Sequence, residues 1–338
     1  MALDHRSERK TLEAKQRDRG AEDGRGPDGP GDLSKTGKKA TFKRTLTEFS
    51  NDSLTDRAAA LTYYSVMAIF PAIIALVSVI GLVGHSLTQT LLDNVDKVAP
   101  GPAKDIFTST IKNVASSKGA AGIAFVLGLA LALNSASAYI SAFARASNEI
   151  YDVEEGRPVW KLKPQQIGVT LVLLLLVVAI TVMVAVSGPL AKEVGKTVGV
   201  GSSASTIWDI AKIPVVLAIV SFMFAFLYWT APNVKTPGFK FVSPGGIVAL
   251  VIWIIASLLF ALYLATFASY AKTYGSLGGV IAFLVWLWVT NVAILFGAEF
   301  NAELQRSQQI EAGEAGTFDE PFLEPRDASK LEKKAAKG

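Results

Sequence analysis

A stripe of polar side chains runs through one long apolar stretch, and its spacing is suited to handling a polar solute. Its members recur every three or four residues, which places them on one side of a helix: Asn134, Ser137, Ser141, Arg145 and Asn148. Polar groups are costly inside a bilayer, so they face a partner helix or a wet cavity. The stripe therefore predicts either a polar path open to the cytoplasm, or interhelical hydrogen bonds with Arg145 reaching the interface. The sequence favours neither alternative.

Charged residues near the end of the same stretch form a candidate cytoplasmic charge cluster. Its members are Glu149, Asp152, Arg157 and Glu299. We expect Glu299 to pair with Arg145 or Arg157, because a carboxylate at the end of a membrane helix needs a cationic partner. The two arginines could also attract an anionic solute or lipid headgroup near the membrane surface.

Two residues in other stretches extend this interpretation. Asn291 lies deep in the last apolar stretch, where it could meet Asn134 across a bundle and lengthen the polar path. Pro71 lies inside the first stretch and frees a backbone carbonyl one turn earlier. It is therefore a candidate hinge, with a static kink as the alternative.

Six apolar stretches of membrane-spanning length must position these groups. They are Leu61–Gly84, Gly119–Phe143, Gln166–Val186, Asp209–Ala231, Gly245–Ala268 and Gly278–Ala298. About 20 apolar residues in a helix cross the hydrocarbon core, and lipid offers no partner for a free backbone N–H or C=O. The sequence therefore predicts an all-α, polytopic membrane bundle of six transmembrane helices, within residues 58–305.

The distribution of basic residues predicts the orientation of this bundle. Most of the 33 Lys and Arg residues fall in the two tails and in the loops 144–165 and 232–244. Because basic segments stay in the cytoplasm, we expect both termini there. Residues 1–39 and 306–338 carry many charges and few large apolar side chains, so we expect two disordered cytoplasmic tails.

Two shorter elements are predicted outside the spans. Within 40–57, Phe42, Leu46 and Phe49 recur at helical spacing between charged residues. This pattern favours an amphipathic helix lying on the cytoplasmic surface, or the same helix packed on the cytoplasmic loops. The loop 85–118 has apolar residues at helical spacing on both sides of a Pro-Gly-Pro break, which predicts a helical hairpin that covers or gates the outer face.

The composition argues against several classes of function. The chain has no cysteine and only two histidines, so disulfides, thiolate chemistry and a histidine metal site are not expected. Acidic residues are almost absent from the spans, and a metal-dependent nuclease needs clustered carboxylates or histidines. We therefore expect no enzyme, no cofactor or metal, and no nucleic-acid partner. The lipid bilayer is the expected partner, and a homo-oligomer stays open.

Several short motifs appear in order along the chain, and together they resemble the YihY/BrkB family of bacterial inner-membrane proteins, once labelled ribonuclease BN. The resemblance covers about residues 41–305. The motifs are Asp56, Ala58-Ala59-Ala60, Tyr63-Tyr64 and Pro71, then Asn148, Tyr151-Asp152-Val153 and Arg157, then Tyr228 and Pro232, Pro244-Gly245-Gly246, Tyr274-Gly275-Ser276-Leu277-Gly278, Trp286-Leu287-Trp288 and Gly297-Ala298-Glu299. Where such proteins commonly read Tyr-Asn-Val, this chain has Asp152, which puts in doubt any role that needs a neutral side chain there.

The resemblance implies a six-helix, multi-pass protein of the bacterial inner membrane, sometimes associated with virulence or serum resistance. It does not imply a settled molecular activity. The leading hypothesis from the residues is a transporter-like or lipid- and anion-handling protein, with its path beside the polar stripe. The alternatives are a non-transporting envelope scaffold or virulence-associated factor, and the disfavoured ribonuclease of the old family label.

Overall fold

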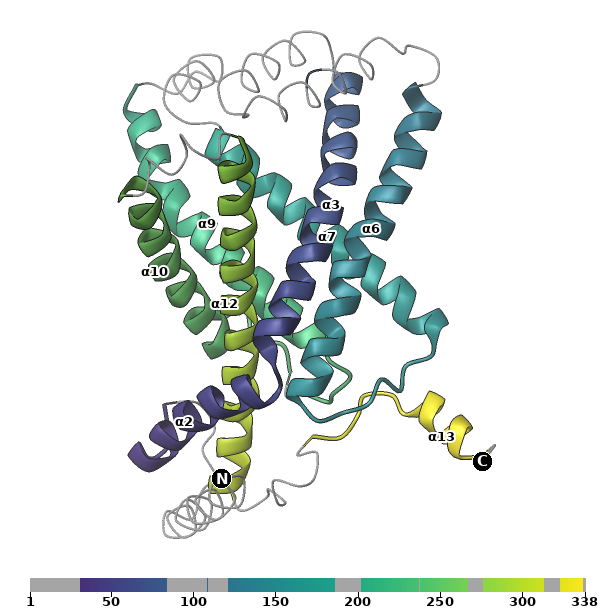
Figure 1. Ribbon diagram of the computed structural model, residues 1–338, viewed down its shortest axis with the longest axis vertical. Helices are drawn as coiled ribbons and strands as arrows, with labels where there is room; N and C mark the ends of the chain where they lie inside the picture. The colour runs from purple at the N-terminus through teal and green to yellow at the C-terminus, as the bar shows by residue number, and fades with distance from the viewer. Residues whose placement is uncertain are drawn as a thin grey trace. The chain divides into compact units, whose positions relative to one another are not determined.

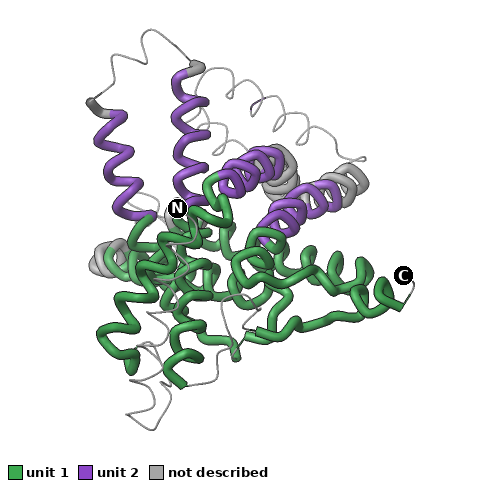
Figure 2. Tube along the Cα trace, turned by 60° about the horizontal axis from the view of Figure 1, so that its bottom comes forward, with its two compact units in different colours: residues 1–55, 144–252, 293–338 green, residues 56–143, 253–292 purple. Residues whose placement is uncertain are grey.

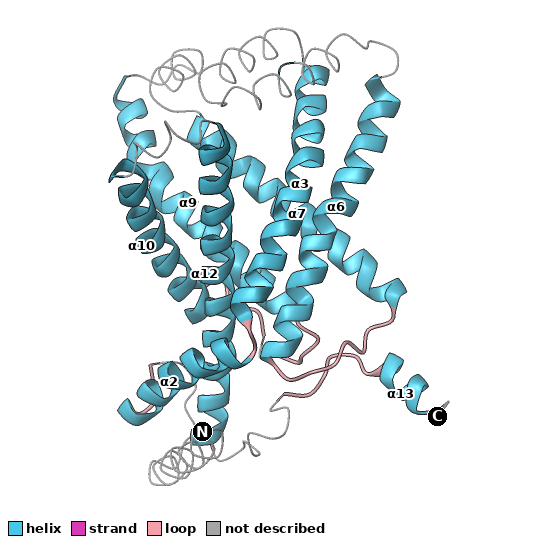
Figure 3. Ribbon diagram, in the orientation of Figure 1, coloured by secondary structure: helices cyan, strands magenta, loops and turns pink. Residues whose placement is uncertain are grey.

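The computed structural model describes residues 31–83, 108, 121–185, 202–236, 238–266, 276–312 and 323–336. Within these ranges the chain is all-helical, with eight helices and no strand (Figures 1 and 3). An isolated antiparallel bridge joins Val234 to Pro325. The helices are α2 (Lys35–Asn51), α3 (Leu54–Val83), α6 (Ala121–Ile150), α7 (Val159–Ala185), α9 (Ser202–Thr230), α10 (Pro244–Thr266), α12 (Ser276–Glu311) and α13 (Ser329–Ala335).

Four of these helices contain segments that are long and apolar enough to cross a membrane. The segments are Val159–Ile180 in α7, Ile210–Thr230 in α9, Pro244–Leu264 in α10 and Gly278–Glu311 in α12. The other two predicted spans correspond to α3 and α6, which are 30 residues long each. The structure thus confirms an all-helical protein with several apolar helices, and the count of six spans stays a prediction.

The chain divides into two compact units, which are coloured separately in Figure 2. Unit 1 comprises residues 1–55, 144–252 and 293–338, and unit 2 comprises residues 56–143 and 253–292. α3, α6, α10 and α12 contribute residues to both units, whereas α2, α7, α9 and α13 belong to unit 1 alone. Unit 1 holds the described loops after α6 and α9 and the whole of α7 and α9, whereas unit 2 holds most of α3, α6 and α10 and the first half of α12.

The ends of α2 and α10 are set by side-chain caps. The Ser34 hydroxyl accepts a hydrogen bond of 2.9 Å from the N–H of Gly37 at the start of α2. The Ser243 hydroxyl accepts one of the same length from the N–H of Gly246 at the start of α10, where Pro244 is the first helical residue. A hydroxyl cap and a proline at the first position are both typical of helix starts, since they satisfy or remove unpaired donors.

Three of the predicted segments differ from the structure or lie outside it. The helix predicted over 40–57 is divided, because α2 ends at Asn51 and a turn with φ of 51° at Ser53 precedes α3. Parts of the predicted disordered tail 306–338 are helical, namely the end of α12 and α13. The hairpin predicted in 85–118 lies outside the described residues, apart from Thr108. Residues 1–30 of the first predicted tail also lie outside them.

Candidate functional site

The stripe predicted on one side of a helix lies on α6, and its members differ in burial. Ser137 and Asn148 are buried, Ser141 is half-buried, and Asn134 and Arg145 are exposed. The Ser137 hydroxyl donates a hydrogen bond of 2.7 Å to the backbone carbonyl of Asn134, within the same helix. That local bond satisfies Ser137 without a solute, and the path beside α6 stays a prediction. Pro71 lies within α3, and its role as a hinge is equally a prediction.

Asn291 lies in unit 2, where its side chain joins three helices. Its amide nitrogen donates to the Thr62 hydroxyl of α3 at 3.1 Å and to the Leu287 carbonyl at 3.0 Å. Its amide oxygen accepts a hydrogen bond of 2.9 Å from the Tyr139 hydroxyl of α6. The partners of Asn291 are therefore Tyr139 and Thr62, whereas the exposed Asn134 was the partner expected from the sequence.

Arg157 forms the centre of a buried polar network in unit 1. Its guanidinium donates to both carboxylate oxygens of Glu155, at 2.7 and 2.6 Å, and to the Ala231 carbonyl at 2.9 Å. Asn148 donates to the same carboxylate at 3.1 Å and accepts a 2.7 Å hydrogen bond from the N–H of Asn233. This network fixes the end of α6 against the loops before α7 and after α9.

Glu155 was missing from the predicted charge cluster, although it is the carboxylate that pairs with Arg157. Partial burial by itself would raise the pKa of Glu155, but the hydrogen bonds and charge of Arg157 lower it below its ordinary value of 4.5. The Glu155 carboxyl group is therefore ionised at neutral pH. Glu155 lies two residues before Arg157 in the sequence, and this spacing did not indicate the pairing. A contact formed within a loop leaves no periodic pattern in the sequence.

Glu299 is buried, with 1% of its surface exposed, and its Oε2 accepts no hydrogen bond within the described residues. Of the two partners expected for Glu299, Arg157 is engaged by Glu155 and the Ala231 carbonyl in the described chain, and pairing with Arg145 stays a prediction. The nearby charged groups that act on Glu299 include Glu303 and Arg306 of the same helix. Glu149 is exposed on α6.

Asp152 occupies a turn that explains why a side chain of the Asn or Asp type suits this position. Its φ is 52°, in the left-handed region that Asn, Asp and Gly tolerate best. Its N–H bonds to the Glu149 carbonyl at 2.9 Å, and the N–H of Val153 bonds to the Asn148 carbonyl at 2.9 Å. These two bonds form a Schellman motif that ends α6. Asp152 is exposed and lies 3.9 Å from Arg306.

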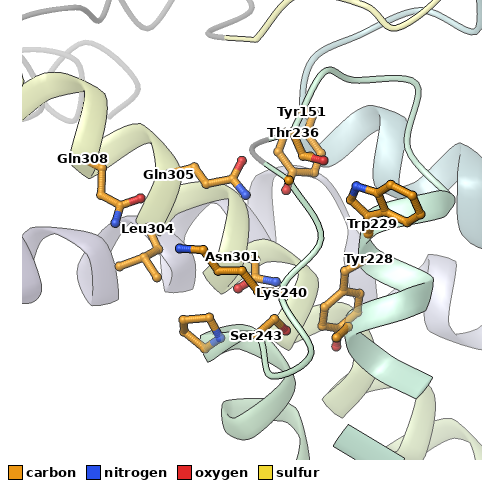
Figure 4. Close-up of a pocket in the computed structure, with 13 residues that line it drawn as sticks. Tyr151, Tyr228, Trp229, Thr236, Lys240, Ser243, Asn301, Leu304, Gln305 and Gln308 are labelled. Atoms are coloured by element: carbon orange, nitrogen blue, oxygen red, sulfur yellow. The ribbon is translucent and has the colours of Figure 1, made fainter. Parts of the chain in front are cut away.

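A pocket in unit 1 lies between the end of α9, the loop that follows it and the last turns of α12 (Figure 4). It encloses about 630 Å³ of empty space, part of it open to solvent. The lining residues are mostly polar or aromatic: Tyr151, Ala225, Tyr228, Trp229, Thr236, Gly238, Lys240, Ser243, Pro244, Asn301, Leu304, Gln305 and Gln308. Sequence analysis did not find this site, because its residues come from four separate segments with no shared spacing.

The chemistry of the lining suits a hydrogen-bonding anion. Among the described side chains that line the pocket, Lys240 carries a charge and the others are neutral. The Thr236 hydroxyl and the Gln305 amide oxygen are buried there without a hydrogen-bond partner in the described part of the chain. Because buried polar groups nearly always find partners, these two atoms are available to bond a polar ligand.

Hydrogen bonds between helices hold the walls of the pocket in place. The Tyr228 hydroxyl of α9 donates to the Ile294 carbonyl of α12 at 2.7 Å. The Asn301 side chain of α12 accepts a 2.8 Å hydrogen bond from the N–H of Gly245 at the start of α10. Two of the lining residues are thus fixed by bonds outside the pocket, which makes the site largely preformed.

The C-terminal segment 323–336 packs against the same part of unit 1. Asn233 donates to the carbonyl of Asp327 at 2.9 Å, and Lys161 pairs with the Asp327 carboxylate at 2.7 Å. Arg326 donates to the Trp229 carbonyl at 2.8 Å, and its guanidinium lies 5.8 Å from the centre of the Trp229 ring. The segment therefore packs against Trp229, one of the residues that line the pocket.

A comparison with family models decides the relationship that the motifs suggested. The model described as Virulence factor BrkB matches residues 45–320. The chain belongs to the BrkB family. Among curated proteins, this BrkB-family chain is similar to the ribonuclease-like protein YfkH of Bacillus subtilis, with 30% identity over 259 residues, which cover 75% of this chain and 91% of YfkH.

Other relatives of the BrkB-family chain are named simply as membrane proteins. It is 23% identical over 279 residues to a UPF0761 membrane protein of Mannheimia succiniciproducens, covering 82% of this chain and 93% of the relative. It is 26% identical over 286 residues to a UPF0761 membrane protein of Alkalilimnicola ehrlichii, covering 81% of this chain and 60% of the relative. No solved structure matches the chain.

Proposed function

We propose that this BrkB-family membrane protein is transporter-like or lipid-handling, and that it binds an anionic solute or a lipid headgroup in the pocket of unit 1. The observation that carries the proposal is the set of side chains that line the pocket, where Lys240 occurs together with hydroxyl, amide and aromatic groups. The path predicted beside α6 is the alternative route for the same ligand.

The pocket is proposed to open on the cytoplasmic side of a bacterial inner membrane, with both termini on that side. The pocket is bordered by the loop after α9, which is one of the segments where the basic residues gather. Arg306 and Arg326 lie on segments next to it. Basic segments remain in the cytoplasm, which supports this orientation.

Three chemical features support an anionic ligand that also makes hydrogen bonds. A lysine ammonium is a compact charge that binds phosphate or carboxylate. The Thr236 hydroxyl can donate a hydrogen bond to such a group, and the Gln305 amide can bond a neighbouring hydroxyl of the ligand. Trp229 and Tyr228 add aromatic surface of the kind that lies at headgroup level in membranes.

The proposal is tested with purified protein in liposomes that hold a fluorescent phosphatidylglycerol or a small labelled anion. We expect the protein to accelerate leaflet transfer of the lipid or efflux of the anion. Lys240→Gln should lower the rate about tenfold, because it removes a charge-assisted hydrogen bond. Lys235→Gln is the matched control, since Lys235 lies in the same loop but pairs with the exposed Glu324 at 2.7 Å.

A further variant separates the two candidate routes. If Arg145→Ala lowers the rate while Lys240→Gln does not, the path beside α6 replaces the pocket as the site of handling. If the wild-type protein moves neither the lipid nor the anion, the proposal is wrong, and the scaffold hypothesis becomes the leading one.

A further inference from the structure

α2 has two different faces, and one of them is fully used in packing. Thr41, Arg44 and Thr45 are buried on this face. Arg44 forms an ion pair of 2.5 Å with Glu303 of α12, and the Thr41 and Ser307 hydroxyls lie 2.6 Å apart. These contacts hold α2 along the last turns of α12 and fix which side of it faces outward.

The opposite face of α2 is exposed and carries two large apolar side chains. Phe42 and Leu46 are 54% and 50% exposed and lie one turn apart. At 100° per residue, four exposed lysines flank this pair along the same half of the helix, namely Lys35, Lys38, Lys39 and Lys43. The outward face therefore consists of an apolar centre bordered by positive charge.

The end of α2 lies beside a membrane-spanning segment. Phe49, near the end of α2, packs on Phe296 of α12 with ring centres 5.5 Å apart. At the other end of α2, the Ser34 hydroxyl donates to the Glu311 carboxylate at 2.7 Å. α2 thus runs along α12 from Glu311, where that apolar segment ends, to Phe296 within it.

We propose that the outward face of α2, formed by Phe42, Leu46 and the four flanking lysines, docks onto an anionic lipid surface. Apolar side chains at the centre enter the boundary between headgroups and acyl chains, while lysine stems reach outward to lipid phosphates. A second copy of this face is a poor occupant, because a symmetric contact would bring like charges together. The proposal does not depend on the pocket or on any transport activity.

The test uses site-directed spin labels on the full-length protein in nanodiscs. The natural chain has no cysteine, so Leu46→Cys gives a single label in the centre of the face. Thr47→Cys is the matched control, because the next residue points about 100° away around the helix. Collision with oxygen reports contact with acyl chains, and collision with a water-soluble nickel chelate reports contact with solvent.

With phosphatidylglycerol present, the label at position 46 should become oxygen-accessible and protected from nickel, while the label at position 47 stays accessible to nickel. In pure phosphatidylcholine the label at position 46 should return to solvent. Replacing Lys35, Lys39 and Lys43 by Gln should shift the docking equilibrium about fivefold per lysine, since each contributes to attraction by anionic lipid. Lys330→Gln and Lys334→Gln on α13 should leave it unchanged.

Three results would overturn the inference. The first is a label at position 46 that stays accessible to nickel in both lipids. The second is burial of that label that does not depend on lipid charge, which would remove the recognition of anionic lipid. The third is protection from both reagents together with spin–spin broadening, which would show that a second copy covers the face.

Discussion

Gly245 and Gly297 bring the backbones of α10 and α12 into direct contact. A Cβ added to Gly245 would lie 2.0 Å from the carbonyl oxygen of Gly297, and a Cβ added to Gly297 would lie 2.4 Å from that of Gly245. Small residues allow such close crossing of membrane helices. Asn301 lies one turn after Gly297 on α12, and its side chain accepts a hydrogen bond from the N–H of Gly245. Because Asn301 also lines the pocket, this crossing sets the base of the pocket.

Gly245→Ala should destabilise the protein by about 1–3 kcal/mol or prevent folding, because the added methyl group meets backbone that cannot move independently. The measurement is thermal unfolding in detergent. Gly168→Ala is the control, since a Cβ at that helical position meets nothing within 4 Å. That variant should be neutral or slightly stabilising. An equal melting temperature for both variants would contradict the close crossing.

Arg157→Ala should destabilise unit 1 by about 3 kcal/mol, because it leaves Glu155 and the Ala231 carbonyl without their shared donor. Arg157→Lys should recover only part of this loss, since an ammonium cannot make the forked contact with Glu155. Chemical unfolding in detergent measures both variants. Lys235→Ala is the control and should cost less than about 1 kcal/mol, because its pair with Glu324 is exposed.

The C-terminal segment should be released at acid pH. Hydrogen bonds from Lys161 and Ser329 hold the pKa of Asp327 well below its ordinary value of 3.8. A carboxylate with a lowered folded-state pKa stabilises its contacts above the unfolded value, and this contribution is lost as the pH falls through the folded value. Residues 323–336 should therefore be protected at neutral pH and lose protection only below pH 3.8.

Hydrogen exchange, corrected for its intrinsic pH dependence, follows this release. Asp327→Asn should already reduce the protection of the segment at neutral pH, because an amide cannot replace the ionised acceptor for Lys161, while the Asn233 and Arg326 contacts remain. Glu324→Gln should leave the exchange unchanged, since that carboxylate is exposed and its ion pair with Lys235 lies at the surface. Equal protection of wild type and Asp327→Asn at pH 7 would show that Asp327 does not anchor the segment.

The helices were predictable from the sequence because membrane helices leave long apolar runs of a fixed minimum length. The starts of α10 and α12 agree within two residues with the predicted stretches that begin at Gly245 and Gly278. The end of α12 was missed, because the chain from Glu299 onward is polar. That part of the helix is held by packing against α2, which a hydropathy pattern does not reveal.

The site was much less predictable than the helices. The spacing of the α6 stripe shows which residues share a side, but not whether that side faces solvent, lipid or another helix. Asn148 lies on α6 with the rest of this stripe, yet its partners Glu155 and Asn233 lie on loops that only the folded chain brings together. The pocket likewise depends on Thr236 and Gln305, which are distant in sequence and follow no motif.

Tyr139 and Asn291 should be coupled energetically, since the Tyr139 hydroxyl donates to the Asn291 amide inside unit 2. A double-mutant cycle with Tyr139→Phe and Asn291→Ala should give a coupling of about 0.6 kcal/mol and at most about 1.7 kcal/mol, the range for hydrogen bonds between membrane helices. The cycle is measured by unfolding in detergent or mixed micelles.

The matched cycle pairs Asn291→Ala with Asn134→Ala, the partner that sequence spacing suggested. Asn134 is exposed on α6, so its removal should add to that of Asn291 without coupling. If instead the Asn134 cycle shows coupling and the Tyr139 cycle shows none, the two asparagines meet in the membrane. The polar path predicted from the sequence would then regain its central contact, because Asn291 would line it together with the α6 stripe.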